Sequence, residues 1–190
     1  AGTAFGGEGS SREATVSMLV EPMLMLSLFA VLFARGSTNF FNVINGNIYT
    51  PSLLLGLSAY IVALLAETGR IPIDNPDTHL ELTMIHEGML LEYSGKYLAL
   101  MELAHYIKQT VLMTLFLVLF FPFGITQKGD ILSLLISTLD YVLKMIILCL
   151  FIAFAESSRA KMRFFQLPSL LGGAFVLSAL SLIVLIIMGK

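Results

Sequence analysis

The sequence has very little cysteine and little charge. One cysteine, Cys149, occurs in 190 residues. A single thiol cannot form an internal disulfide or hold an iron–sulfur cluster, so we expect the chain itself to bind no redox cofactor and no metal. Only 13% of the residues are charged, well below the roughly 25% typical of soluble domains. The net charge of −2 gives no reason to expect a nucleic-acid partner.

Two further features are missing near the first residue. The glycines before Arg12 are not followed by a lysine next to serine or threonine, which a phosphate-binding loop requires, so a nucleotide site is excluded. No signal peptide is recognisable and residue 1 is alanine, so we expect processing or a longer parent chain. Ser10 and Glu13 have the spacing of a helix capping box, which predicts a helix starting near Ser11.

Long apolar runs dominate the rest of the chain, in which 57% of residues are hydrophobic. A helix of about 20 apolar residues crosses the hydrocarbon core, and helices satisfy their own backbone hydrogen bonds there. The runs therefore predict an all-α, polytopic membrane protein, with residues 1–190 as one membrane domain. The expected spans are residues 11–34, 51–66, 98–121, 131–155 and 168–188.

A polar, acidic stretch over residues 67–97 separates the second and third expected spans. It carries two prolines and two histidines, the side chain that ordinarily titrates near neutral pH. Apolar residues are scattered through it, which favours a folded, partly buried loop over a plain acidic linker. The candidate proton-coupling residues of this loop are Glu67, Arg70, Asp74, Asp77, His79, Glu81, Glu87 and Glu92.

Basic residues predict the orientation of the chain. Six fall on the side of the acidic loop, against three on the other side, which places the loop in the cytoplasm by the positive-inside rule. The six are Arg12, Arg70, Lys96, Arg159, Lys161 and Arg163, and the three are Arg35, Lys128 and Lys190.

Ionisable residues also lie inside the expected spans: Glu21, Glu102, His105, Lys108, Asp140 and Lys144. A charge at the centre of a span costs about 2.5–3.5 kcal/mol on insertion scales, so these residues require an explanation. One interpretation is a proton path that rises from the acidic loop to mid-membrane, where helix geometry places Lys108 and Asp140. The other is that Asp140 and Lys144, spaced i, i+4, form a neutral pair that joins helices, with Glu102 at the membrane interface.

Several motifs resemble the subunit-1 family of respiratory complex I. The segments are Ala66-Glu67-Thr68-Gly69-Arg70-x-Pro72-x-Asp74, then Glu81-Leu82 and Glu92-Tyr93-Ser94-Gly95. The match extends over essentially the whole chain. Ser10-Ser11-Arg12-Glu13 and Asp74-Asn75-Pro76-x-Thr78-His79 resemble the hydrogenase-type branch, namely group 4 [NiFe] hydrogenases and formate hydrogenlyases. Arg159-x-x-x-Arg163 with Gln166-Leu167 resembles the basic loop late in the family.

The resemblance implies a membrane anchor and proton-coupling subunit in the cell membrane, without catalysis of its own. Fe–S clusters and the [NiFe] centre would lie in peripheral partner subunits, and antiporter-like membrane subunits would be further partners. Contact with the peripheral subunits is expected at Arg12, Glu13, Arg159, Lys161 and Arg163.

The sequence also departs from the complex I members. The motif of those members is similar to Pro-Glu-Ala-Glu, whereas this chain has Pro76-Asp77-Thr78-His79 at the matching positions. They also tend to carry an acidic residue at the position of His105. Both differences favour the hydrogenase branch over quinone binding. About three N-terminal helices of the family are missing, so the chain resembles the C-terminal part of the usual subunit.

Three alternatives remain open at this point. The chain could be the quinone-site subunit of an NADH:quinone oxidoreductase, which hydrogen-evolution and quinone-reduction assays would separate from a hydrogenase subunit. A stand-alone proton or ion transporter predicts inverted repeats, and none is recognisable. A passive anchor predicts that neutral substitutions of the ionisable residues in the spans are tolerated.

The basic residues Arg159, Lys161 and Arg163 generate the first prediction. Replacing all three by glutamine should release peripheral subunits at moderate salt, because exposed charge contacts are screened beyond about 8 Å at physiological ionic strength. Retention of these subunits on membranes is measured as salt is raised. Normal retention at high salt would leave these residues only their role in topology.

Overall fold

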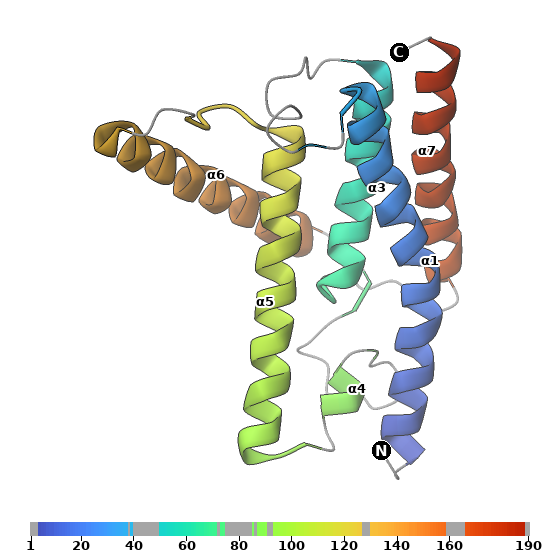
Figure 1. The fold of residues 1–190 in the computed structure, drawn as a ribbon. Coiled ribbons are helices and arrows are strands. Elements are labelled where there is room, and N and C mark those ends of the chain that lie inside the picture. The colour runs from blue at the N-terminus through green and yellow to red at the C-terminus, as the bar shows by residue number, and fades with distance from the viewer. Residues whose placement is uncertain are drawn as a thin grey trace.

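The computed structural model describes residues 4–37, 39, 50–71, 73–74, 85, 87–90, 93–126, 130–158 and 166–188. All regular secondary structure in these residues is helical, and the order of helices is shown in Figure 1. The helices are α1 (Ala4–Ala34), α3 (Pro51–Glu67), α4 (Glu87–Leu90), α5 (Gly95–Phe120), α6 (Ile131–Ser157) and α7 (Leu167–Ile187).

Four of these helices, α1, α5, α6 and α7, are long and apolar enough to cross a membrane. α3 is apolar but has 17 residues, about 26 Å at 1.5 Å per residue, slightly less than the hydrocarbon core. The all-helical, polytopic membrane fold predicted from the apolar runs is therefore confirmed. α3, α5, α6 and α7 each begin and end within three residues of the predicted spans.

α1 differs from its predicted start. It begins at Ala4, and Ser10, which was expected to cap it, lies inside the helix. The hydroxyl of the next residue, Ser11, donates to the Glu8 carbonyl at 2.9 Å, as a serine within a helix does. The extra turns pack against α4, and a side chain on Gly9 would come within 3.1 Å of the Gly88 backbone. Tertiary packing of this small residue thus outweighs the low helix propensity of the glycines.

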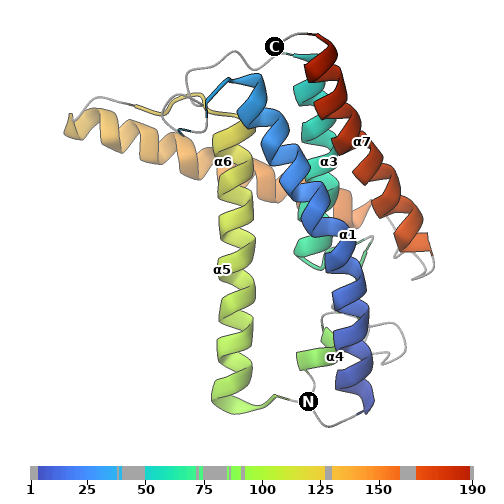
Figure 2. The same cartoon turned by 45° about the vertical axis from the view of Figure 1, so that its right-hand side comes forward.

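The core of the bundle is formed by α1, α3 and α7, which run side by side in Figures 1 and 2. Small residues allow α3 and α7 to approach closely. The buried Ser181 hydroxyl donates to the Ser52 carbonyl at 2.6 Å, and a side chain on Gly56 would lie 3.2 Å from Ser181 Oγ. This is the pattern of helix association within membranes, where small residues and interhelical hydrogen bonds take the place of hydrophobic driving force.

α5 joins this core through its second half. Tyr60 of α3 is fully buried, and its ring lies 5.6 Å from the rings of both Phe116 and Phe120. Its hydroxyl donates to the Leu112 carbonyl at 3.1 Å, which satisfies the polar atom of a buried aromatic residue. Most of the first half of α5 is exposed, so one face of this helix continues beyond the bundle that it packs against.

α6 crosses the bundle steeply instead of running along it, as both views show (Figures 1 and 2). Its corner with α5 is fixed by charge: Lys144 pairs with Asp140 at 2.6 Å and donates to the carbonyls of Phe121, at 3.3 Å, and Phe123. Gly124, with φ of 74°, lies so close that an added Cβ would be 2.7 Å from the Asp140 carboxyl carbon. These contacts support the interpretation of Asp140 and Lys144 as a neutral pair that joins helices.

The two ends of α5 provide a test of orientation. Ser94 precedes α5 and Asp130 precedes α6, and both are exposed. With the native thiol removed by Cys149→Ser, Ser94→Cys should resist a membrane-impermeant maleimide in intact cells, whereas Asp130→Cys should react. Both positions should react after permeabilisation. The opposite labelling pattern in intact cells would reverse the orientation that the basic residues predict.

Candidate functional site

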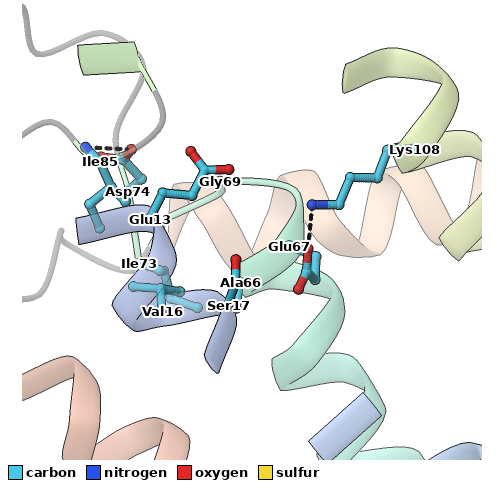
Figure 3. A pocket seen from close by; sticks show the side chains of 10 residues that line it. All are labelled: Glu13, Val16, Ser17, Ala66, Glu67, Gly69, Ile73, Asp74, Ile85 and Lys108. Atoms are coloured by element: carbon cyan, nitrogen blue, oxygen red, sulfur yellow. Dashed lines mark hydrogen bonds and ion pairs between the residues drawn. The ribbon is translucent and has the colours of Figure 1, made fainter. Parts of the chain in front are cut away.

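A small cavity lies where α1, the end of α3 and α5 meet (Figure 3). Its volume is about 30 Å³, room for roughly two water molecules, each of which needs some 10–15 Å³. The polar side chains that line it are Glu13, Ser17, Glu67, Asp74 and Lys108, and the apolar ones are Val16, Ala66, Ile73 and Ile85.

The sequence Glu67-Thr68-Gly69-Arg70 ends α3 at this cavity. Gly69 has φ of 58°, its N–H donates to the Ala66 carbonyl at 3.2 Å, and the Arg70 N–H donates to the Leu65 carbonyl at 3.1 Å. This pair of bonds is the Schellman motif, which favours glycine because a Cβ penalises left-handed backbone. The helix therefore ends immediately after Glu67, and its carboxylate projects toward α5.

Glu67 forms an ion pair with Lys108, which lies midway along α5 (Figure 3). The Glu67 side chain is 8% exposed, whereas that of Lys108 is 47% exposed. A buried carboxylate is stable in its charged form only when it is paired or hydrogen-bonded, so Lys108 supplies what Glu67 needs. Lys108 is therefore the more exposed member of the pair.

Asp74 lies on the loop side of the cavity and is 3% exposed. Its carboxylate accepts a hydrogen bond from the Ile85 N–H at 3.1 Å, which joins two parts of the acidic loop eleven residues apart in sequence. Glu13 and Ser17 face the cavity from successive turns of α1. Three carboxylates, one hydroxyl and one ammonium thus surround a space of water-molecule size, an arrangement suited to exchanging protons.

The structure describes only some of the other predicted site residues. Arg70 pairs with Glu156, at the end of α6, at 3.8 Å, a contact that the sequence did not suggest. Arg12 pairs with Glu8 one turn earlier on α1. Asp77, His79, Glu81, the Glu87 side chain, Glu92, Arg159, Lys161 and Arg163 lie outside the part of the chain that the structure describes.

The predicted intramembrane path falls into separate groups. Lys108 belongs to the cavity, whereas Asp140 and Lys144 lie at the α5–α6 corner, about 20 Å further along α5. The prediction that Lys108 and Asp140 share one depth is wrong, because α6 crosses the bundle instead of running parallel to α5.

The other residues of that path flank the cavity. Glu21 and Glu102 are exposed on α1 and α5, and His105 is half-buried with its ring 6.1 Å from that of Tyr106. Sequence reasoning missed Ser17 because a single serine in an apolar run gives no signal of its neighbours. Within the described ranges, no three His, Cys, Asp or Glu side chains converge as metal ligands would.

Comparison with known proteins decides which family this architecture represents. The family model described as NADH dehydrogenase matches residues 1–189. The chain belongs to this NADH dehydrogenase family. Within it, the chain is 37% identical to hydrogenase-4 component C of Escherichia coli (strain K12), over 95% of this chain and 58% of that protein. This match confirms the resemblance to the complex I subunit-1 family and its hydrogenase branch.

Two further relatives support the assignment to the NADH dehydrogenase family. Formate hydrogenlyase subunit 4 of E. coli (strain K12) is 32% identical over 97% of this chain and 61% of its own length. A subunit of the NADH-quinone oxidoreductase of Methylococcus capsulatus (strain ATCC 33009 / NCIMB 11132 / Bath) is 27% identical over 85% of this chain and 49% of its own length. The chain thus spans about three fifths of the two more similar relatives.

The Glu67–Lys108 pair generates a prediction of stability. Lys108→Met should destabilise the protein by about 1–3 kcal/mol, because it leaves a buried carboxylate without its partner. Adding Glu67→Gln to Lys108→Met should recover most of that loss, since the double variant buries no unpaired charge. The measurement is thermal unfolding of the four proteins of this cycle in the same detergent. Additive effects of the two substitutions would mean that the pair is not coupled.

Proposed function

We propose that this chain is the membrane anchor and proton-coupling subunit of a complex-I-like oxidoreductase of the membrane-bound [NiFe] hydrogenase type. In this proposal the Fe–S clusters and the [NiFe] centre belong to peripheral partner subunits on the cytoplasmic face. The observation that carries the proposal is the buried Glu67 carboxylate, paired with the exposed Lys108, beside a water-sized cavity shared with Glu13 and Asp74.

The pair can take up a proton by a simple electrostatic route. When Lys108 is withdrawn, Glu67 is a buried carboxylate without a countercharge, and its protonated form is then favoured. When the ammonium returns, the charged carboxylate is favoured again and the proton leaves for the cavity. Glu13 and Asp74 border the same space and can exchange this proton through one or two water molecules.

Movement of the acidic loop provides the link to electron transfer. Asp74 holds two parts of the loop together at the cavity through its bond with Ile85, and Arg70 ties the start of the loop to Glu156 of α6. Electron transfer in a partner docked on the loop would add negative charge close to these groups and shift the loop. The shift is transmitted to Glu67 directly, because Glu67 is the last residue of α3 before the loop begins.

A hydrogenase-type complex is favoured over a quinone-reducing one by the comparisons. Identity is 37% and 32% to proteins named for hydrogenase-4 and formate hydrogenlyase, and 27% to one named for NADH-quinone oxidoreductase. His105 and the Asp77-Thr78-His79 segment point the same way. Hydrogen evolution with no quinone reduction by the purified complex is the expected assay result.

The direct test is Glu67→Gln in the assembled complex. Glutamine keeps the size of the side chain but cannot carry the proton, so the rate of proton uptake should fall strongly. Redox turnover and proton uptake are measured in the same proteoliposomes. Asp130→Asn is the matched control, because it removes an exposed carboxylate at the start of α6, outside the cavity, and should leave both rates unchanged.

The outcomes separate coupling from anchoring. Tight coupling predicts that redox turnover slows together with proton uptake, and loose coupling predicts that it continues. If Glu67→Gln, with the complex intact, leaves both rates at the level of Asp130→Asn, the pair is structural and the chain is an anchor only.

A further inference from the structure

Most hydroxyl groups on the described helices bond to the backbone of their own helix. On α1, the Ser27 hydroxyl donates to the Met23 carbonyl, four residues earlier, at 2.9 Å. The same bond to a carbonyl three or four residues earlier occurs at Ser11, Thr15, Ser58, Thr110, Thr114 and Ser178. This is the usual way in which a helical serine or threonine satisfies its hydroxyl without water.

Ser17 of α1 is an exception to this pattern. It is partly buried, and its hydroxyl has no hydrogen-bond partner in the described part of the chain. Ser10 and Ser169 also lack a partner within these ranges, but both are exposed. A partly buried hydroxyl that does not bond to its own helix costs free energy unless another group binds it. The side that Ser17 faces should therefore supply that group.

Ser17 faces the cavity beside the Glu67–Lys108 pair. In Figure 3 it lies between Glu13 and Glu67, which line the same cavity. Glu13 precedes Ser17 by four residues, about one turn and about 6 Å along α1. The cavity has room for roughly two water molecules, and a buried water needs two to four polar partners. The Ser17 hydroxyl and the two carboxylates meet this requirement.

The hydrogen-bonding capacities of these groups give the hydroxyl a definite role. Ionised carboxylates only accept, so a water between Glu13 and Glu67 donates both of its hydrogens to them, and its oxygen then needs a donor. Lys108 is paired with Glu67, and Asp74 already accepts from the Ile85 N–H at 3.1 Å, so the Ser17 hydroxyl is the suitable donor. When one carboxyl group is protonated it donates to the water, and the hydroxyl can turn to accept from the water instead. Serine thus serves the water in both protonation states.

We infer that Ser17 is a positioning residue that binds a water molecule between Glu13 and Glu67, and that this water carries the proton between them. The water accepts the proton of the Glu13 carboxyl group while it gives one of its own hydrogens to the Glu67 carboxylate. Glu13 becomes ionised, Glu67 becomes neutral, and the water is regenerated. Binding of the water is independent of the proposed function, whereas the proton transfer rests on it.

The first experiment locates the water by electron cryomicroscopy of the assembled complex, at a resolution that shows ordered water. The native complex should show a water within about 3 Å of Ser17 Oγ, and Ser17→Ala should lose or displace it. Ser27→Ala is the matched control and should keep the water, because Ser27 bonds to its own helix and does not line the cavity. An empty cavity in the native complex, or a water that stays in place in Ser17→Ala, would overturn the inference.

The second experiment measures the rate of proton uptake by the same variants in proteoliposomes. Ser17→Ala should lower the rate by about tenfold, the equivalent of one lost hydrogen bond, whereas Ser27→Ala should leave it unchanged. Ser17→Thr should restore most of the rate, since threonine keeps the hydroxyl.

Glu67→Gln in the same assay separates failure of this inference from failure of the proposed function. An unchanged rate in Ser17→Ala, together with slow uptake in Glu67→Gln, would overturn the role of Ser17 and leave the proposed function standing. Unchanged rates in both variants would contradict the proposed function and the proton transfer together, and any water at Ser17 would then be structural.

Discussion

The buried carboxylate of Glu67 requires a countercharge, and this requirement links α3 to α5 at the centre of the protein. Glu67 is the last residue of α3, and the Schellman turn that follows fixes its place between three elements of the bundle. Its side chain is 8% exposed, so it requires a countercharge, and Lys108 supplies this charge from α5. This one ion pair thus connects the end of α3, where the acidic loop begins, to the middle of α5.

Two other ion pairs have different consequences because their surroundings differ. Asp140 and Lys144 lie at the corner between α5 and α6, where Lys144 also donates to the Phe121 carbonyl and Gly124 packs against Asp140. Arg70 and Glu156 are 3.8 Å apart and partly exposed, so salt screens them and they contribute less. Among the described residues, only the Glu67–Lys108 pair combines a buried carboxylate, an exposed lysine and an adjoining cavity. We propose on this ground that the pair exchanges protons and is more than a structural clamp.

Hydropathy was sufficient to predict the helices, because a span of about 20 apolar residues has few alternatives in a bilayer. It could not predict that α1 begins at Ala4, since that extension depends on Gly9 meeting the Gly88 backbone. Nor could it predict the steep crossing of α6, which results from contacts of Lys144 with carbonyls beyond the end of α5. Contacts between residues far apart in sequence therefore determine the start of α1 and the direction of α6, which hydropathy alone does not.

The candidate site was predicted as a set of residues but not as an arrangement. Glu67 and Lys108 were both identified from charge in unusual places, yet they lie 41 residues apart on different helices, and the sequence contains no signal of their pairing. The acidic loop motif was specific enough to indicate the family, which the comparisons confirm. Ser17 and Glu156 became visible only through the packing of α1 and α6.

The central claim is that Glu67 changes its protonation state as electrons pass through the complex. Redox-triggered infrared difference spectroscopy of the intact complex measures this directly, because protonated and ionised carboxyl groups absorb at different frequencies. The account predicts a protonated-carboxyl band that appears on reduction, shifts in D₂O and disappears in Glu67→Gln, but persists in Asp130→Asn. An unchanged difference spectrum in Glu67→Gln would contradict it.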